Sequence, residues 1–251
     1  MAWKHGADEQ GSVRFDGSFL YPGDLVAAPN PDMSLQDAIL TRRTVRAYRP
    51  EPVPFGLFEQ LVETAMHAPT ACDEQRWKII YIDDPSVLMD LYERGSAAVL
   101  TKAKQAFLVT YNSHTDNLQY LDHVQSAASF IATFGLVAHS AGVGSCWLGH
   151  LPNKGELRRI FNIHPLFEPI ALVTFGYYRE KVKMRPRKRS AVQIIFKGRF
   201  EREGLQFSKA KNVPLRTIVR TLYYLLPTFL RRRLRKYSLK YEKKFYNEVY
   251  D

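Results

Sequence analysis

Residues 67–77 read HAPTACDEQRW, and the apolar run KIIYI follows directly at 78–82. The first stretch combines a proline, small residues, a thiol, two carboxylates, an amide, a guanidinium and an indole. Pro69 excludes it from a helix interior, and a simple turn needs only a few of these residue types. The stretch therefore predicts a loop that holds a ligand or partner immediately before a strand.

The composition indicates a globular protein. Of 251 residues, 45% are hydrophobic and 13% aromatic, which is enough for the core of one domain with extensions or of two small domains. Cys72 and Cys146 provide no disulfide framework and suit a reducing compartment. The N-terminus lacks the apolar core of a signal peptide, and no apolar run reaches the roughly 18 residues of a spanning helix. We therefore expect a cytoplasmic location.

The positive charge is concentrated near the C-terminus. Residues 181–251 contain 21 Lys and Arg but only 5 Asp and Glu, whereas the whole chain carries a formal charge of +11. A mildly acidic body is thus followed by a strongly basic segment. Such asymmetry favours an anionic partner, either a membrane surface, a nucleic acid or a phosphorylated ligand.

Helices and strands are expected to alternate irregularly. Apolar spacing predicts helices at 34–43, 53–68, 85–95, 123–142 and 154–163, and strands at 77–84, 106–112 and 168–178. Ser34 is a plausible N-cap, and the helix at 123–142 is apolar on most faces, as buried helices are. Residues 144–152 form a turn or a short strand. This order does not match a doubly wound parallel fold.

Four arginines lie within eight residues of one another. RRTVRAYRP places Arg42, Arg43, Arg46 and Arg49 around the hydroxyl of Thr44. Guanidinium groups this dense require an anion or carboxylates, and their forked donors match phosphate. A solvated helix C-terminus, whose dipole favours basic residues, is the alternative.

The glycines of AGVGSCWLGH do not form a dinucleotide-binding turn. A helix runs into them, whereas that turn follows a strand and opens a helix. Gly142 suits the C′ position of the helix, and the other glycines could let the backbone approach a flat ligand. Ser145 and Cys146 lack the partners of a nucleophile, so we expect buried small residues. The seven histidines show no metal-ligand spacing, so no metal site is expected.

Six segments, taken in order, resemble the nitroreductase family of flavin enzymes. They are RRTVR at 42–46, PVP at 52–54, APTACDEQRW at 68–77, GVGSCWLG at 142–149, GYY at 176–178 and RKRSAVQII at 187–195. The resemblance covers residues 34–196.

The resemblance implies an α+β fold with a central, mostly antiparallel sheet flanked by helices, in an interlocked homodimer that holds FMN at its interface. NADH or NADPH would reduce FMN by hydride transfer in a ping-pong reaction. The reduced flavin would then reduce a small-molecule substrate, which could be a nitroaromatic, a quinone or a pathway-specific metabolite. No catalytic side chain is implied, because the flavin carries the chemistry.

The resemblance also assigns residues to the cofactor. Arg42, Arg43, Thr44 and Arg46 would surround the phosphate, the ribityl chain and the pyrimidine edge, and Arg187 and Arg189 would reach the phosphate from the other side. Pro69, Thr70 and Ala71 would line the ring of the partner subunit's flavin, while Gln75 and Trp77 fix the loop. The backbone of Trp147, Leu148 and Gly149 would lie by flavin N5.

Two positions depart from the family pattern. Asp73 stands where the family has Asn, and Arg76 stands where it has Pro. A carboxylate only accepts hydrogen bonds, so Asp73 beside the flavin would make reduction harder. Alternatively, Arg76 or Arg46 pairs with Asp73 and the site stays neutral.

We expect an N-terminal arm at 1–33, an FMN domain at 34–200 and a basic amphipathic extension at 201–251. Within 205–251 an apolar stripe lies beside basic residues, and Pro227 should break the helix. The stripe suits either an anionic membrane surface or the partner subunit, and the charge favours the membrane. Two other functions remain open. One is a flavin-destroying enzyme like the one that makes dimethylbenzimidazole, and the other is a non-catalytic nucleic-acid or membrane-binding protein on a flavin fold, with nucleic acid the less favoured partner.

Overall fold

The computed structural model describes residues 33–115, 117–178 and 186–199, together with 218, 221–223, 225–227, 229–231 and 233–234. The N-terminal arm and most of the extension therefore lie outside the described residues.

Four antiparallel strands form the centre of the molecule. They are β1 (Trp77–Ile82), β2 (Gln105–Asn112), β3 (Val143–Leu148) and β4 (Phe167–Tyr177), in the order β1-β2-β4-β3. The predicted α+β class with an antiparallel sheet is confirmed. Of the two alternatives for 144–152, the structure has a strand, β3, at one edge of the sheet.

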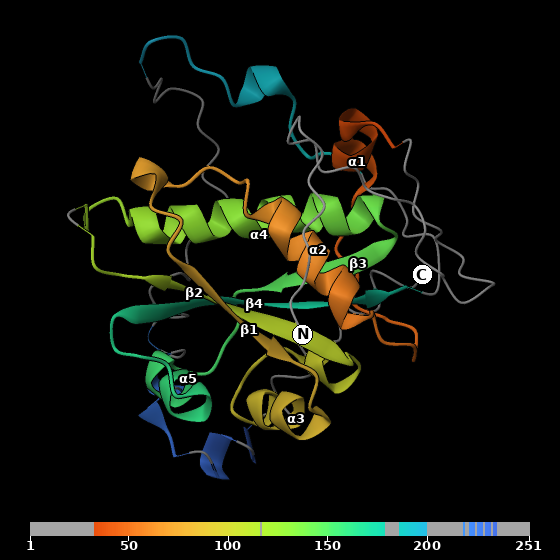
Figure 1. Ribbon diagram of the computed structural model, residues 1–251. Coiled ribbons are helices and arrows are strands. Elements are labelled where there is room, and N and C mark those ends of the chain that lie inside the picture. The colour runs from red at the N-terminus through yellow and green to blue at the C-terminus, as the bar shows by residue number, and fades with distance from the viewer. Residues whose placement is uncertain are drawn as a thin grey trace, which may run out of the picture.

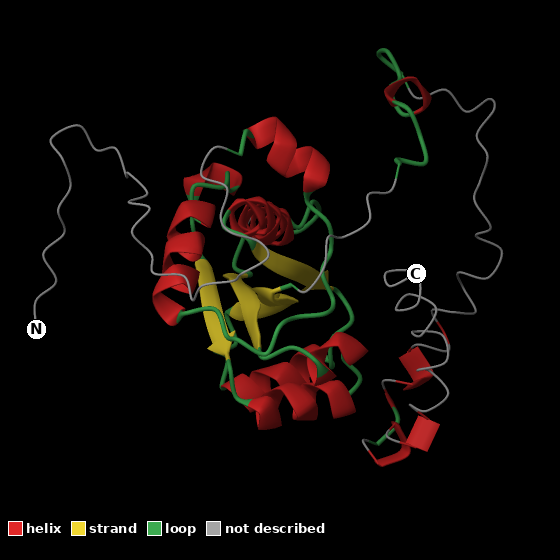
Figure 2. Ribbon diagram, turned by 90° about the vertical axis from the view of Figure 1, so that its right-hand side faces the viewer, coloured by secondary structure: helices red, strands yellow, loops and turns green. Residues whose placement is uncertain are grey.

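Helices cover both faces of this sheet (Figures 1 and 2). On one face lie α2 (Phe55–Ala65) and α4 (Asp122–Ser140), and on the other lie α3 (Pro85–Glu93) and α5 (Lys154–Phe161). A short helix, α1 (Leu35–Thr41), lies over the C-terminal end of α4 (Figure 1). The short 3-10 helices are η1 (Ala71–Asp73), η2 (Ala98–Thr101) and η3 (Ala191–Gln193).

Each face of the sheet has its own apolar core. Between the sheet and α2/α4, the rings of Phe58, Phe107, Phe134 and Phe175 pack together. The ring centroids of Phe107 and Phe134 are 4.6 Å apart, in an edge-on contact. Such pairs stabilise a core by about 0.5–1.5 kcal/mol beyond their buried area. Strand β2 is buried on both faces, which explains its unbroken apolar run.

The helix ends follow their local sequence. The Ser34 side chain accepts a hydrogen bond from the Asp37 N–H, so Ser34 is the N-cap of α1 as predicted. Gly142 follows α4 with a φ of 72°, and its N–H bonds to the His139 carbonyl. This left-handed conformation suits glycine at a helix C-terminus.

Residues 44–48 run along the edge of the sheet beyond β3. Thr44 forms a parallel bridge with Ser145, and Tyr48 an antiparallel bridge with Tyr178. A Cβ on Gly144 would lie 2.7 Å from a methyl carbon of Val45, so glycine is required for this approach. Our explanation of Gly144 was therefore wrong, because this glycine admits the chain's own segment 44–48 and not a flat ligand.

Candidate functional site

The RRTVR segment is held where α1, β3 and α4 meet. The Val45 N–H donates to the Ser145 carbonyl at 3.0 Å, which fixes the backbone between the arginines. The Arg42 side chain lies against α4 and β3, since a Cβ on Gly135 would be 3.6 Å from Arg42 Cδ and 3.7 Å from Ser145 Oγ. Arg42 is the C-cap of α1, in keeping with the helix-end alternative, but Arg42, Arg43 and Arg46 are all half-buried and not fully solvated.

These three arginines have no acidic partner among the residues that the structure describes. The described ion pairs join other residues, such as Arg76 to Glu74, Arg94 to Asp90 and Lys154 to Glu168. Arg46 instead lies beside the thiol of Cys146. Half-buried guanidinium groups without carboxylates are suited to an external anion, and phosphate matches their geometry.

Cys146 is not set up as a nucleophile. Only 1% of it is exposed, and burial raises the pKa of its thiol although the Arg46 guanidinium acts in the opposite direction. A protonated, buried thiol is inert. The described part of the chain also has no cluster of three His, Cys, Asp or Glu side chains that could bind a metal ion.

His139 belongs to this corner of the molecule and was not singled out from the sequence. Its Nε2 lies 2.8 Å from Thr41 Oγ1, and the Thr41 hydroxyl donates to the Asp37 carbonyl at 2.6 Å. The hydroxyl therefore accepts from the His139 ring. Burial lowers the pKa of His139, and the positive charge of Arg42 lowers it further. Its position three residues before the predicted helix C-terminus was the only sequence signal.

Trp147, Leu148 and Gly149, which were expected to lie beside the flavin ring, are at and directly after the C-terminal end of β3. Leu148 is buried, Trp147 is 49% exposed, and a Cβ on Gly149 would meet nothing within 4 Å. Ser145 and Gly149 are about 13 Å apart along an extended chain. The RRTVR segment thus pairs with β3 at Ser145, whereas Trp147–Gly149 lie further along the chain, at and after the end of that strand.

The loop at 69–75 lies elsewhere. The Ala71 N–H donates to Ser126 Oγ at the N-terminal end of α4, whereas Arg42 and His139 lie at its C-terminal end. Ser126 and His139 are separated by about 20 Å along the helix. Figure 1 shows η1 and α1 over opposite ends of α4. Within one subunit, Pro69, Thr70 and Ala71 are therefore remote from the arginines.

The contacts of Asp73 exclude the predicted arginine pairing within the described chain. Arg76 binds Glu74 at 3.1 Å, and Arg46 lies by Cys146. Asp73 is exposed and accepts a hydrogen bond from Gln75 Nε2 at 2.7 Å. Its φ of 54° is one of three positive values in the loop, with Cys72 and Gln75. This conformation favours Asn and Asp among residues other than glycine, so the exchange of Asn for Asp is compatible with the backbone.

Arg187 and Arg189 are not brought to the other arginines. They lie in the described stretch 186–199, which is exposed throughout and lies away from the sheet in Figures 1 and 2. Its apolar side chains include Val192, 86% exposed, and Ile195, 64% exposed.

Comparison with known proteins places the chain in a family. A sequence model of the nitroreductase family matches residues 39–121 and 93–177. The chain belongs to the nitroreductase family. It is 30% identical over 152 residues to a "Putative NADH dehydrogenase/NAD(P)H nitroreductase" of Methanothermobacter thermautotrophicus, covering 59% of this chain and 79% of the relative. It is 35% identical over 94 residues to an NADH dehydrogenase of Thermus thermophilus, covering 38% of this chain and 46% of that relative.

Solved structures show the same fold. An FMN-dependent nitroreductase from Clostridium difficile superposes with a TM-score of 0.57 at 19% identity, over 65% of this chain and 98% of that one. A nitroreductase family protein from Streptococcus pneumoniae superposes with a TM-score of 0.56 at 18% identity, over 66% of this chain and 100% of that one. The nitroreductase-like fold and the oxidoreductase class expected from the sequence are therefore confirmed.

Proposed function

We propose that this nitroreductase-family protein is an FMN-dependent homodimer that takes electrons from NADH or NADPH and reduces a nitroaromatic, a quinone or a pathway-specific metabolite. The supporting observation is the group of Arg42, Arg43 and Arg46, which are half-buried and have no described carboxylate partner. Their segment is fixed to β3 by the bond from the Val45 N–H to the Ser145 carbonyl. A phosphorylated cofactor would supply the missing negative charge.

The residues present fit FMN. Arg42, Arg43, Thr44 and Arg46 would hold the phosphate and ribityl end, and Trp147, Leu148 and Gly149 would lie beside the ring further along β3. Bound FMN supplies the electron transfer between reductant and acceptor. The chain binds and orients the two ends of the cofactor, and it needs no side-chain nucleophile, in keeping with the inert Cys146 thiol.

A second subunit would complete this site. The loop at 69–75 meets α4 at Ser126, and the Arg42 side chain meets it at Gly135, about 14 Å further along the helix. Pro69, Thr70, Ala71, Asp73 and Gln75 would therefore serve the partner's cofactor. Helix α1 beside the arginines exposes Leu35 by 70% and Leu40 by 58%, an apolar surface that a partner would cover. Arg187 and Arg189, outside the body, would likewise reach a phosphate only in the assembly.

The matched family region lies inside the proposed FMN domain at 34–200, with an arm at 1–33 before it and an extension at 201–251 after it. We retain these boundaries as part of the proposal.

Purified protein should release FMN on denaturation, and Arg42→Ala with Arg46→Ala should abolish retention. Each charge-assisted hydrogen bond contributes about 1.5–3 kcal/mol, so FMN affinity should fall by about a hundredfold or more. Arg159→Ala is the control, because Arg159 is exposed on α5 at the other face of the sheet.

Unchanged FMN affinity in the double variant, measured by fluorescence titration, contradicts the assignment. Recovery of intact FMN after turnover with NADH or NADPH separates the proposed activity from flavin destruction. Analytical ultracentrifugation tests the homodimer independently.

A further inference from the structure

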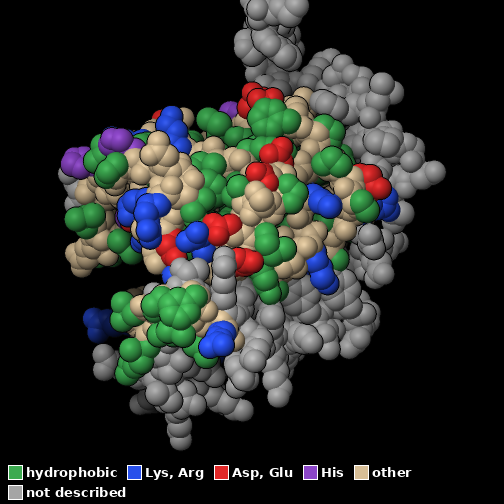
Figure 3. Space-filling view, turned by 90° about the horizontal axis from the view of Figure 1, so that it is seen from below, with side chains coloured by type: hydrophobic (Ala, Val, Ile, Leu, Met, Phe, Trp, Pro, Cys, Tyr) green, Lys and Arg blue, Asp and Glu red, His purple; other side chains and the backbone are tan. Residues whose placement is uncertain are grey.

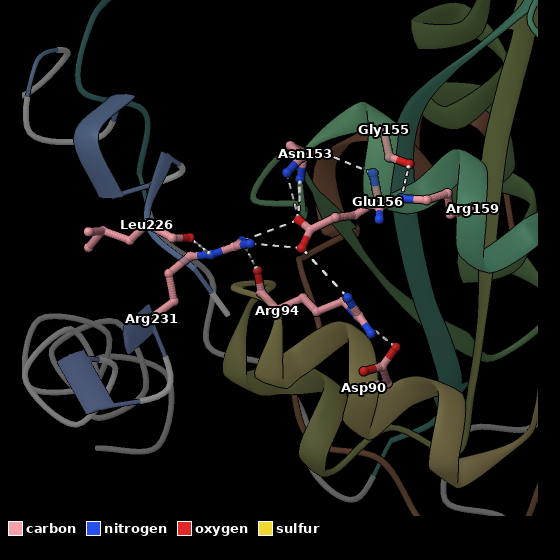
Figure 4. A network of polar contacts seen from close by, with 8 residues as sticks. All are labelled: Asp90, Arg94, Asn153, Gly155, Glu156, Arg159, Leu226 and Arg231. Atoms are coloured by element: carbon pink, nitrogen blue, oxygen red, sulfur yellow. Dashed lines mark hydrogen bonds and ion pairs between the residues drawn. The ribbon is translucent and has the colours of Figure 1, made fainter. Parts of the chain in front are cut away.

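The described part of the C-terminal extension is fastened to the body by one buried arginine. Arg231 is 4% exposed, and its guanidinium donates to both carboxylate oxygens of Glu156 at 2.8 and 3.2 Å. It also donates to the carbonyls of Arg94 at 3.2 Å and Leu226 at 2.9 Å (Figure 4). The sequence of the run LRRRLRK at 230–236 favours exposure, because five of its seven side chains are charged. Arg231 is buried nevertheless, because a bidentate carboxylate compensates its charge.

The partner of Arg231 is itself held in place. Glu156 is the third residue of α5, and its carboxylate accepts from the backbone N–H of Asn153 in a capping box at the start of that helix, and from the Asn153 side-chain amide as well. Arg94 lies 3.6 Å from the same carboxylate and is held by Asp90 of α3 (Figure 4). Burial alone would raise the pKa of Glu156, but its bonds to Arg231 and the neighbouring positive charges hold that pKa below its usual value.

Pro227 makes this attachment possible. The helical residues are interrupted at Leu226 and Pro227, as the sequence predicted. Because the Leu230 and Arg231 N–H groups bond to the Pro227 carbonyl, the Leu226 carbonyl accepts from the Arg231 side chain. The break therefore supplies one of the carbonyls that hold the Arg231 guanidinium.

With Arg231 facing inward, a stripe of apolar side chains faces outward. Before the break, Ile218, Leu222 and Leu225 are 56%, 57% and 75% exposed, and their spacing of four and three residues is that of one helix face. Beyond the break, Phe229 is 67% exposed as well. The view from below in Figure 3 shows hydrophobic side chains gathered on this outlying part, with Lys or Arg beside them. Figures 1 and 2 place it on the far side of the α3/α5 layer from α1 and the arginines of the proposed FMN site.

The sequence on either side of this stripe carries charge of one sign. Between Gly204 and Glu242 the sequence contains no Asp or Glu. The basic residues there are Lys209, Lys211, Arg216, Arg220, Arg231, Arg232, Arg233, Arg235, Lys236 and Lys240. Only Arg231 is neutralised by the body in the described structure, and its neighbour Arg233 is exposed.

We propose that the face formed by Ile218, Leu222, Leu225 and Phe229 binds the surface of an anionic lipid membrane, and that the Arg231–Glu156 contact orients it outward. Exposed apolar side chains enter the boundary between headgroups and acyl chains, while basic side chains meet lipid phosphates. A second copy of this chain is a poorer partner for the face, because it would bring the same excess of positive charge against it. No described helix has the length and hydropathy to cross a bilayer, and surface binding requires none.

The test is co-sedimentation of the full-length protein with vesicles of phosphatidylcholine alone and of phosphatidylcholine mixed with phosphatidylserine. Binding is expected only to the mixed vesicles at low salt, and it should weaken as the screening length falls from about 10 Å at 0.1 M to about 3 Å at 1 M salt. Leu225→Glu and Phe229→Glu should each weaken binding by about tenfold or more, the effect of losing one inserted apolar side chain.

Leu118→Glu is the matched control, because Leu118 is 64% exposed in the loop between β2 and α4. Its vesicle binding should equal that of the unchanged protein, and thermal melting should confirm that all variants are folded. Absence of low-salt binding, or equal binding by the Leu225, Phe229 and Leu118 variants, overturns the proposal. A change from dimer to monomer caused by Leu225→Glu assigns the face to a second copy and also overturns it. FMN content is a separate measurement, so the proposed redox function stands or fails independently.

Discussion

Arg42 and Arg231 both lie partly or wholly out of solvent, but their surroundings are opposite. Arg231 is 4% exposed and is matched by Glu156, by two carbonyls and by a helix cap that holds Glu156. Arg42 is half-buried with Arg43 and Arg46 on one segment, and no described carboxylate pairs with any of them. Arg231 is paired with a carboxylate of its own chain, whereas Arg42, Arg43 and Arg46 are positioned to bind an external anion.

This difference separates two roles for the same side chain. A buried charge is tolerated when a partner and hydrogen bonds compensate it, so the Arg231 contact is complete and can serve as an attachment. Clustered guanidinium groups repel one another until an anion binds. The segment 44–48 is held against that repulsion by its bridges to Ser145 of β3 and to Tyr178, directly after β4, which keeps the arginines in position before any ligand arrives.

The largest expected effect comes from breaking the complete contact. Arg231→Met removes the bidentate partner of the Glu156 carboxylate and leaves it with Asn153 and with Arg94 at 3.6 Å. Removing one partner of a buried pair costs about 3–5 kcal/mol. The extension can lift away and let water reach Glu156, so we expect detachment and not global unfolding. Limited proteolysis should cleave the extension at least tenfold faster. In Arg233→Met, which alters an exposed neighbour, the extension should be cleaved at the rate of the unchanged protein. Equal cleavage rates in the Arg231 and Arg233 variants would contradict the attachment.

A smaller effect is expected where the open arginine segment meets the sheet. In Gly144→Ala the new Cβ would lie 2.7 and 2.8 Å from Val45 side-chain atoms and 2.9 Å from Tyr178 Cδ1. Overpacking of this kind costs about 1–3 kcal/mol. Denaturant unfolding should show that loss, and FMN affinity should fall with it because segment 44–48 must move. Gly56→Ala is the control, since its Cβ meets nothing within 4 Å; an equal loss there would show that the effect is not local.

These two regions also differ in what the sequence could predict. The helices, the strands, the Ser34 cap and the left-handed Gly142 follow from local patterns, and they agree with the structure. Gly144 was explained wrongly, because its neighbours Val45 and Tyr178 are distant in the chain. Arg231 was missed for the same reason. The Asn153 and Glu156 pair is visible as a capping signal, but nothing local indicates that an arginine 75 residues away will share that carboxylate.

The candidate site was predictable in part. Density of charge pointed to Arg42, Arg43 and Arg46, and the structure leaves all three without a described carboxylate. The position of the loop at 69–75, at the other end of α4, depends on tertiary packing through Ser126. Ala71 and Ser126 are 55 residues apart in the chain, so no local pattern indicates this position.

The smallest expected effect is a change in the titration of His139, and it distinguishes the two arginine environments most directly. Burial and the Arg42 charge both lower the pKa of His139 from its usual value of 6.5. Protonation of His139 therefore opposes folding, and its contribution to stability is present above the unfolded pKa and lost as pH falls through the folded pKa. An anion held by Arg42 offsets part of that charge, so the pKa of His139 should rise when the anion binds.

Sulfate is the suitable probe, because its charge does not change over the range in which histidine titrates. Proton NMR of the flavin-free protein should show the His139 pKa rising on addition of sulfate. In Arg42→Ala that pKa should already be higher without sulfate and should respond less to it. Glu156 provides the contrast, since its pKa is lowered by Arg231 within the chain and should stay where it is on addition of sulfate at constant ionic strength. A His139 pKa that sulfate leaves unchanged would mean that Arg42 holds no anion, and the distinction between an open and a completed arginine site would then be lost.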